Sequence, residues 1–280
     1  MLTYRRPSAL RLGAVVFAVV VGLAIALVAT LSAAQAAPVG MLKQFKVPTA
    51  GSSPEHITQA SDGNFWFTES FVNDQNALPH KVGRITPSGQ VTEFDVCEHP
   101  DFGFESCFPT DIVQGSDGIL YFTKNDAPLG RITMDGQVLP DAGERFSFNG
   151  NGLDAHGDDI WVTDFNNHSV WRYDIPTATF TEFRTPTAGS TPLDVAVASD
   201  GVVWFTEGNG QIGRLDPNTE VITEIDVDGF PREINIASDG AVWFTERFTP
   251  QAVGRIDVAL DGNPWFTMLD ADKIATLQLR

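Results

Sequence analysis

Short apolar runs alternate with polar turns along most of this chain, and one such unit returns several times. Its most regular copy is Asp62–Glu69, where an Asp-Gly pair precedes Asn-Phe-Trp-Phe-Thr-Glu. Asp-Gly supplies the positive φ that tight hairpin turns need, and the run behind it is rich in the aromatic and branched residues that strands favour. The aromatic anchors of the six copies are Trp66, Tyr121, Trp161, Trp204, Trp243 and Trp265. They stand 55, 40, 43, 39 and 22 residues apart, and a period near 40 indicates stacked supersecondary units.

Each unit predicts four short strands. In the first unit the ranges are Pro54–Ala60, Asn64–Thr68, Val82–Thr86 and Gln90–Val96. The last of these alternates polar and apolar residues, as an outer, half-solvated strand should. The third carries a Gly-Arg-Ile core, with Arg84, that returns in later units with Arg131, Arg214 and Arg255. These arginines could bind a ligand, but their recurrence indicates that they pair with carboxylates of neighbouring units. No amphipathic helix is indicated beyond residue 36.

Four antiparallel strands per forty residues, repeated about six times, are typical of the blades of a β-propeller. The sequence therefore predicts an all-β propeller of six or seven four-stranded blades. Met41–Pro48 has the pattern of an isolated fourth strand, and Lys273–Leu279 that of an isolated third strand. Pairing of these terminal strands is expected to close the ring.

The interval between Trp243 and Trp265 departs from the repeat, because it is 17 residues shorter than the shortest regular interval. One outer strand and the next inner strand are missing, so one blade is expected to be truncated near residues 257–261. A merged blade and a deletion that leaves an open ring both fit this pattern. An exposed strand edge there would favour aggregation.

The first 36 residues have the features of an export signal. Arg5, Arg6 and Arg11 precede an uncharged apolar run, 13–31, and Ala34-Gln35-Ala36 forms a small-x-small cleavage site. The apolar run is long enough to span a bilayer, so an uncleaved anchor is the alternative. Both interpretations place a single folded domain, residues 37–280, outside the cytoplasm, as a secreted or cell-surface protein.

Without this segment the chain has 15 basic and 36 acidic residues, a net charge of −21. Such a domain repels nucleic acid and anionic membranes, so membrane contact is expected only through an uncleaved N-terminal segment. We expect a monomer. The charge suits a cation or a cationic ligand, although solubility alone would also explain it.

Cys97 and Cys107 are the only cysteines of the chain. In an exported protein, two cysteines this close together predict a disulfide that closes the intervening loop. A metal site with His99 is the alternative, but it falls short of the four ligands of a structural site.

Two sets of polar residues recur at fixed places in the repeat. The first set, near the start of each inner strand, is His56, Asp111, Asn151, Asp194 and Glu233. The second set, three residues after each anchor, is Glu69, Lys124, Asp164, Glu207 and Glu246. Consecutive antiparallel strands bring these ends together, so both sets are expected at one mouth of the central channel.

Carboxylates and a histidine that converge there could hold Mg²⁺ or Ca²⁺, or a cationic ligand. The predicted metal ligands are His56, Asp111, Asp194 and Glu233. The predicted ligand-binding residues are Glu69, Asp164, Glu207, Glu246 and Arg232. A hydrated acidic rim, whose carboxylates accept hydrogen bonds from turn amides, is the alternative.

The repeats resemble those of the streptogramin lyases, the virginiamycin B lyase family, across the whole chain after the signal. The shared elements are the Pro-x-x-Ile starts, the Trp-Phe-Thr-Glu second strands, the Gly-Arg-Ile third strands and the Thr-Glu-Phe fourth strands. The resemblance implies a seven-bladed propeller. It also implies a Mg²⁺-assisted elimination that opens cyclic depsipeptide antibiotics at their ester bond, and hence antibiotic resistance.

At the catalytic positions that the resemblance implies, this chain differs. Arg232 stands where the family has a histidine, a second histidine-bearing strand falls in the missing segment before Asp261, and Leu269 replaces a glutamate. The catalytic residues are therefore unknown, and we expect a ligand-binding propeller that has lost the family's histidines. The alternatives are a metal-dependent lyase or hydrolase that opens cyclic depsipeptide esters or lactones, and a structural platform.

Overall fold

The computed structural model describes residues 45–70, 80–96, 107–124, 129–142, 149–227 and 229–247, and the backbone of 253–256, 265–268 and 273–276. The chain divides into two units, Met1–Lys46 and Val47–Arg280, and the fold concerns the second. The predicted signal segment lies outside the described residues. In the described part no helix is long and apolar enough to cross a membrane.

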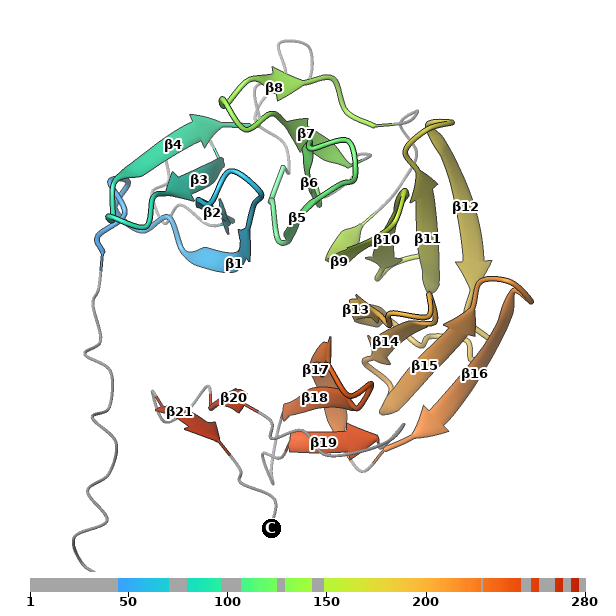
Figure 1. The fold of residues 1–280 in the computed structure, drawn as a ribbon. Coiled ribbons are helices and arrows are strands. Elements are labelled where there is room, and N and C mark those ends of the chain that lie inside the picture. Colours follow the sequence, from blue (N-terminus) through green and yellow to red (C-terminus); the bar gives the residue numbers. More distant parts are fainter. Residues whose placement is uncertain are drawn as a thin grey trace, which may run out of the picture. The chain divides into compact units, whose positions relative to one another are not determined.

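The second unit is built from antiparallel sheets (Figure 1). The first sheet comprises β1 (Pro54–Gln59), β2 (Phe65–Glu69), β3 (Lys81–Ile85) and β4 (Val91–Asp95). The second comprises β5 (Ile112–Gln114), β6 (Leu120–Phe122), β7 (Gly130–Ile132) and β8 (Val138–Leu139). The third comprises β9 (Gly150–His156), β10 (Asp159–Asp164), β11 (Ser169–Asp174) and β12 (Thr179–Arg184). The fourth comprises β13 (Pro192–Val197), β14 (Val203–Glu207), β15 (Gln211–Asp216) and β16 (Val221–Asp226).

The C-terminal sheets have fewer described strands. The fifth comprises β17 (Phe230–Ile236), β18 (Val242–Arg247) and β19 (Val253–Ile256), and the last pairs β20 (Trp265–Met268) with β21 (Lys273–Thr276). The predicted truncation near 257–261 lies outside the described residues, as do Met41–Gln44 and Leu277–Leu279. The closing strand pair therefore stays a prediction, and so does the number of blades.

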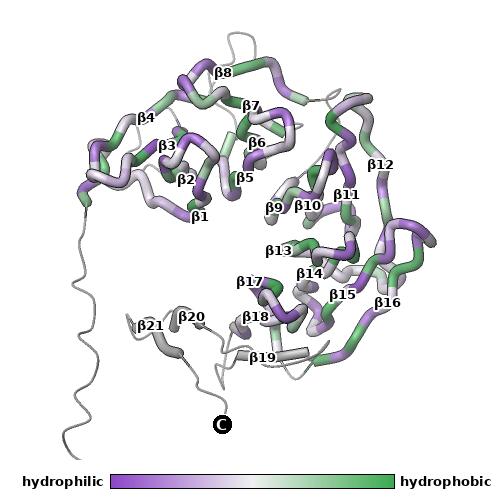
Figure 2. The backbone as a smooth tube through the Cα atoms, in the orientation of Figure 1, coloured by the Kyte–Doolittle hydropathy of each residue, from purple (hydrophilic) through white to green (hydrophobic). Residues whose placement is uncertain are grey.

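The prediction of an all-β propeller is confirmed. The four-stranded sheets follow one another along the chain, and their first strands contact in sequence: β1 meets β5, β5 meets β9, β9 meets β13 and β13 meets β17. In Figure 1 the first strand of each of these sheets lies on the inner side and the last on the outer side. The outer strand β16 carries both hydrophobic and hydrophilic residues (Figure 2), and exposed and half-buried residues alternate along 221–225, as its half-solvated position requires.

The core is divided into clusters that fill the spaces between adjacent sheets. Trp66 packs with Ile112 and Phe122 of the second sheet, and Trp161 packs with Val195 and Phe205 of the fourth. These large side chains are almost fully buried, as predicted for the repeated aromatic anchors. Each sheet is therefore stabilised mainly by its neighbours.

Candidate functional site

The first strands of five sheets surround a cavity of about 540 Å³. β1, β5, β9, β13 and β17 all contribute to its wall, and Trp243 of β18 adds an aromatic surface. This volume is in the range of small-molecule binding sites. Four residues of the first predicted set, His56, Asp111, Asp194 and Glu233, line this cavity.

A threonine near the end of each second strand identifies the equivalent residue in each first strand. Its hydroxyl accepts the N–H of His56, Asp111, Gly152, Asp194 and Glu233, at distances of 3.1, 2.8, 2.9, 3.1 and 3.2 Å. In four sheets the strand register also shifts at this position. Such bulges re-aim side chains, and here they mark the residues that face the cavity.

The third member of the set is therefore Gly152, and the prediction of Asn151 is wrong. A Cβ at Gly152 would lie 2.5 Å from both the Cα and Oδ1 of Asp194 in the next sheet. No side chain fits there, because the two inner strands approach too closely. The third repeat lacks the proline that starts the others, and this missing marker caused the misplacement.

His56 lies between two carboxylates from other sheets. Its Nδ1 is 3.2 Å from Oδ1 of Asp111, and its Nε2 is 3.8 Å from Oε2 of Glu233. The His56 side chain is 35% exposed and that of Glu233 is 53% exposed, whereas Asp111 is buried. The cavity thus holds a buried aspartate, a half-buried histidine and an accessible glutamate.

The charges around His56 determine its protonation. Burial lowers its pKa, but the hydrogen bond and the charge of Asp111, together with the charges of Glu233 and Asp194, raise the pKa to about 9. His56 is therefore an imidazolium at neutral pH. It can donate a proton, but it cannot accept one.

Three buried or half-buried aspartates tie neighbouring sheets together through backbone amides. Asp111 accepts the N–H of Ile112 and of Leu153 in the next sheet, each at 2.7 Å. Asp194 repeats this with Val195 at 2.9 Å and with Ile234 of the fifth sheet at 2.7 Å.

In the third sheet Gly152 has no side chain, and Asp154 makes the corresponding hydrogen bonds to the next sheet. It accepts the N–H of Ala155 at 2.8 Å and that of Val197 in the fourth sheet at 2.7 Å. The prediction that carboxylates accept amide hydrogen bonds thus fits the inner strands. The bonds run from one sheet to the next, and their donors are strand amides.

Burial also affects these carboxyl groups. It is the largest cause that raises the pKa of Asp194 well above its usual range, and the charges of Glu233 and Asp111 add to it. Burial likewise raises the pKa of Asp154. The inner wall therefore carries less negative charge than its residue types suggest, and Glu233 is the most exposed of the acids that line the cavity.

These residues do not fit a metal ion as they are arranged. Among the described residues no three His, Cys, Asp or Glu side chains are placed to hold one. Both nitrogens of His56 face carboxylates, and the oxygens of Asp111 and Asp194 accept amide hydrogen bonds. This arrangement gives the predicted Mg²⁺ or Ca²⁺ site at His56, Asp111, Asp194 and Glu233 no support, and the site stays a prediction.

The second predicted set lies at the same end of the sheets, as expected from the pairing of Pro54 with Glu69 and of Pro192 with Glu207. Its side chains do not line the cavity, however. Asp164 is buried and accepts the N–H of Asn166 and Asn167, each at 3.2 Å.

Elsewhere in the second set, Lys124 pairs with Asp141, with Nζ to Oδ1 and Oδ2 distances of 2.9 and 3.0 Å. Glu246 is partly buried beside Gly229. Arg232 is partly exposed, and its carbonyl accepts a hydrogen bond from Thr206 at 2.7 Å. A ligand-binding role for Glu69, Asp164, Glu207, Glu246 and Arg232 remains a prediction.

Glu69 and Glu207 are fully buried, and none of their carboxyl oxygens has a well-formed hydrogen bond to a described residue. Burial raises the pKa of Glu69 to about 7 and that of Glu207 to about 8. For Glu69, Ser52 lowers the pKa and the charge of Glu93 raises it; for Glu207, the charge of Glu224 raises the pKa and Ser190 lowers it. These glutamates belong to the packing between strands.

Cys107 is disulfide-bonded, and the described residues include no free cysteine. Its predicted partner Cys97 lies outside the described residues. The Cys97–Cys107 pairing accordingly stays a prediction.

Comparison with known proteins gives consistent results. The model of the virginiamycin B lyase family matches residues 24–141 and 152–263. A virginiamycin B lyase of Nocardia farcinica (strain IFM 10152) is 30% identical over 152 residues, which are 54% of this chain and 48% of that protein. The match thus spans about half of the curated relative.

Solved structures extend the similarity over most of the chain. The virginiamycin B lyase of Staphylococcus aureus is 26% identical with a TM-score of 0.69, covering 86% of this chain and 85% of that one. A catalytically inactive histidine-to-alanine variant of that lyase, with quinupristin, is 25% identical with a TM-score of 0.67 and covers 85% of each chain.

Proposed function

Because the chain belongs to the virginiamycin B lyase family, we propose that it is an exported member that binds a cyclic peptide or another small molecule with a basic group. The ligand would occupy the cavity between the five first strands. The size of this cavity supports the proposal, as do the exposed apolar side chain of Ile57 and the indole of Trp243 on its wall. The exposed carboxylate of Glu233 offers a partner for a cation.

The observation that carries the proposal is the position of His56 between Asp111 and Glu233. An elimination needs a base that removes a carbon-bound proton. The raised pKa leaves His56 protonated at neutral pH, so it cannot serve as this base. The resemblance implies that Arg232 stands where the family has a histidine, and an arginine does not deprotonate in proteins. Binding without the family's elimination is the function that these residues support best.

The inactive relative supports this separation of binding from catalysis. The Staphylococcus aureus variant is described as catalytically inactive, and its structure was determined with quinupristin. Loss of one histidine in that protein is therefore compatible with a bound antibiotic. By analogy, a chain that lacks the family's histidines can retain the cavity and its ligand.

A lyase or hydrolase remains the second candidate, favoured by the pairing of an imidazolium with an accessible carboxylate. In an elimination Glu233 would take the α-proton, and the electron pair of that C–H bond would form a Cα=Cβ double bond. The Cβ–O bond would break at the same time, and its electron pair would leave on the released carboxylate. The His56 imidazolium would lie on the side of the leaving group as a proton donor. The product would have the mass of the substrate.

The decisive experiment incubates the purified protein with quinupristin, with and without Mg²⁺, and separates the products by chromatography with mass detection. We expect unchanged quinupristin and saturable binding by calorimetry. A ring-opened product of the same mass would establish elimination, and a product heavier by one water would establish hydrolysis. Either product would overturn the binding proposal.

Replacing Glu233 by Gln tests the cavity as the site. Glu233→Gln removes the accessible charge, so we expect quinupristin to bind roughly three- to tenfold more weakly, the range of a partly solvated charge contact. The matched control is Glu220→Gln, an exposed glutamate in the turn between β15 and β16. Equal affinities of both variants would place the ligand elsewhere.

A further inference from the structure

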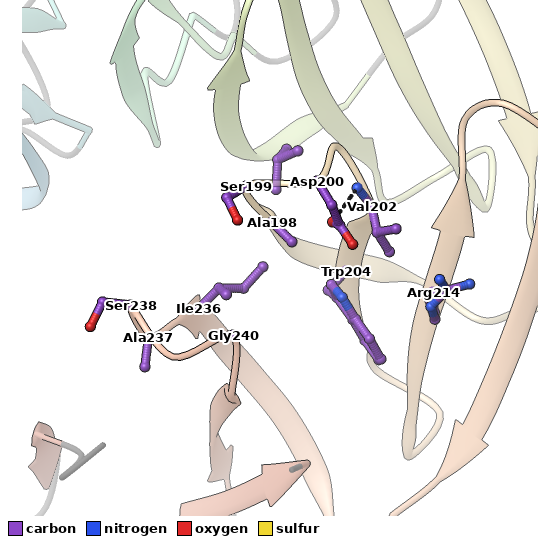
Figure 3. Close-up of a pocket in the computed structure, with 11 residues that line it drawn as sticks. Ala198, Ser199, Asp200, Val202, Trp204, Arg214, Ile236, Ala237, Ser238 and Gly240 are labelled. Carbon is purple, nitrogen blue, oxygen red and sulfur yellow. Dashed lines mark hydrogen bonds between the residues drawn. The ribbon is translucent and has the colours of Figure 1, made fainter. Parts of the chain in front are cut away.

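A second cavity, of about 330 Å³, lies between the fourth and fifth sheets (Figure 3). It begins where β13 ends, at Val197, and includes the turns that lead into β14 and β18. The central cavity instead borders β13 at Asp194, Val195 and Ala196. The two cavities therefore lie toward opposite ends of the same inner strand.

Trp204 and Arg214 face each other in this second cavity. They are directly paired across β14 and β15, and the guanidinium carbon of Arg214 lies 5.8 Å from the centre of the Trp204 ring. Val202 and Ile236 add apolar surface, and the exposed residue Ser199 stands at its edge. The cavity thus combines an apolar wall with the guanidinium of Arg214 and the side chain of Asp200.

The equivalent arginines of the first three sheets have polar partners. Arg84 donates to the carbonyl of Met134 in the next sheet at 2.9 Å, and Arg131 donates to that of Pro140 at 2.7 Å. Nε of Arg172 lies 3.9 Å from Oδ1 of Asp159. The expectation that these arginines pair with carboxylates of neighbouring blades is wrong for Arg84 and Arg131, which bind carbonyls, and Arg172 pairs within its own sheet.

Arg214 differs from these three. Within the described part of the chain its guanidinium has no hydrogen bond or ion pair, and its contact with Trp204 is the interaction that positions it. The turn that gives Arg84 its partner lies between the third and fourth strands of the next sheet. In the fifth sheet that turn would follow Ile256, and it lies outside the described residues.

The space beside Trp204 is also less filled than in two other sheets. Phe94 stacks on Trp66 at 5.4 Å between ring centres, and Phe183 lies 5.5 Å from Trp161. The register places Ile225 at the corresponding position of the fourth sheet, where it is 37% exposed. An aliphatic side chain thus replaces the ring that covers the Trp–Arg pair elsewhere.

We propose that this second cavity is a binding site for a small organic monocarboxylate with an apolar body. A guanidinium binds a carboxylate through two parallel hydrogen bonds, and the Trp204 ring keeps the Arg214 fork in place. The apolar wall takes the body of the ligand. Asp200, whose Oδ1 accepts the N–H of Val202 at 3.1 Å, also lines the cavity. Its charge and the net charge of −18 disfavour polyanions such as phosphate esters.

The test titrates the protein with phenylacetate and follows binding by calorimetry or ligand-observed NMR. We expect saturable binding, and at least tenfold weaker binding of phenylacetamide, which has the same shape without the charge. Arg214→Gln should weaken phenylacetate binding at least tenfold. Arg172→Gln, at the same register position of the third sheet, should leave it unchanged. Absence of saturable binding, or equal affinity of Arg214→Gln, would overturn the proposal.

A second variant keeps the test valid if Arg214→Gln fails to fold. Ser199→Glu adds a negative charge at the exposed edge of the cavity, so it should weaken phenylacetate binding while Ser199→Gln does not. Unchanged binding by Ser199→Glu would place the carboxylate elsewhere and refute the site. Phenylacetate binding should also survive His56→Gln, because His56 belongs to the other cavity.

Discussion

At the residue scale, one position of the repeat holds a different buried polar side chain from sheet to sheet, and each is accommodated in its own way. The residue three positions after the aromatic anchor is an ion-paired lysine in the second sheet, Lys124, and an amide-bound aspartate in the third, Asp164. Glu69 and Glu207 are buried without well-formed hydrogen bonds, and both have raised pKa values. A buried carboxyl group without a partner favours its neutral form. The same position therefore binds a carboxylate or backbone amides in two sheets, and in two others it holds a glutamate with a raised pKa.

The raised pKa of Glu207 makes stability depend on pH. The folded state holds a proton up to about pH 8, whereas the unfolded state releases it near the ordinary value of 4.5. Between these values the folded state binds more protons, so its stability falls as pH rises, by a few kcal/mol at most. We expect Glu207→Gln to reduce this slope in urea unfolding between pH 5 and 8, and the double variant with Glu69→Gln to reduce it further.

The control for this titration is Glu55→Gln, an exposed glutamate of β1. It should leave the pH dependence of the unfolding free energy as it is in the unmodified protein. If Glu207→Gln shows the same slope as Glu55→Gln, the buried carboxyl group is not protonated in the folded state.

At the scale of strands, two residues that recur together in the sequence meet directly across a strand pair. Phe67 lies opposite Gly83, and Phe205 lies opposite Gly213. A Cβ at either glycine would lie 2.1 Å from the facing phenyl ring, so the ring occupies the place of a side chain. In the third sheet Val162 replaces the phenylalanine and Trp171 replaces the glycine. Large and small residues are exchanged as a pair, which keeps the packing volume of the sheet.

This exchange predicts strong coupling in the fourth sheet. Gly213→Trp alone should fail to fold or lose more than about 3 kcal/mol, because the added ring meets Phe205. Phe205→Val alone should lose on the order of 2–4 kcal/mol through the cavity it leaves. The double variant should lose at least about 1 kcal/mol less unfolding free energy than the two single losses added together, as measured by denaturant unfolding. If the losses of the two single variants simply add in the double variant, the smaller residue at 205 does not compensate for the larger one at 213.

At the scale of the whole second unit, polar bonds from sheet to sheet accompany the hydrophobic clusters between sheets. Besides the aspartates, the repeated threonines donate to carbonyls of the next sheet: Thr163 to Leu193 at 3.0 Å and Thr206 to Arg232 at 2.7 Å. These bonds hold the inner strands close together, and Gly152 marks the closest approach to Asp194. The spacing of the inner strands fixes the width of the central cavity.

Gly152→Ala tests this close approach. Its Cβ would meet the backbone of Asp194, which cannot rotate away, so we expect a loss of about 1–3 kcal/mol or more in unfolding free energy. Asn151→Ala is the matched control, since the neighbouring side chain is partly exposed. Equal stability of the two variants would mean that the third and fourth sheets can separate without cost.

The sequence by itself determined the repeat, the strands and the aromatic packing between sheets. Turn chemistry and the alternation of apolar residues act over a few positions, so they can be read without knowing the neighbours. The positions of Trp66 and Trp161 in the core follow from this local pattern. The choice of His56, Asp111 and Glu233 as neighbours of one another also followed from the repeat, because equivalent inner-strand residues converge.

Only the tertiary structure decided which polar residues are accessible to a ligand. Asp194 and Glu207 have the same residue types as accessible acids, yet one binds amides of the next sheet and the other is enclosed between strands. Gly152 replaced Asn151 because the distance between two strands far apart in the sequence excludes a side chain. Among the described residues, Arg214 has the Trp204 ring as its neighbour, whereas Arg84 and Arg131 bind carbonyls. Contacts between sheets depend on what the next sheet offers at that point, and a local sequence pattern carries no information about that.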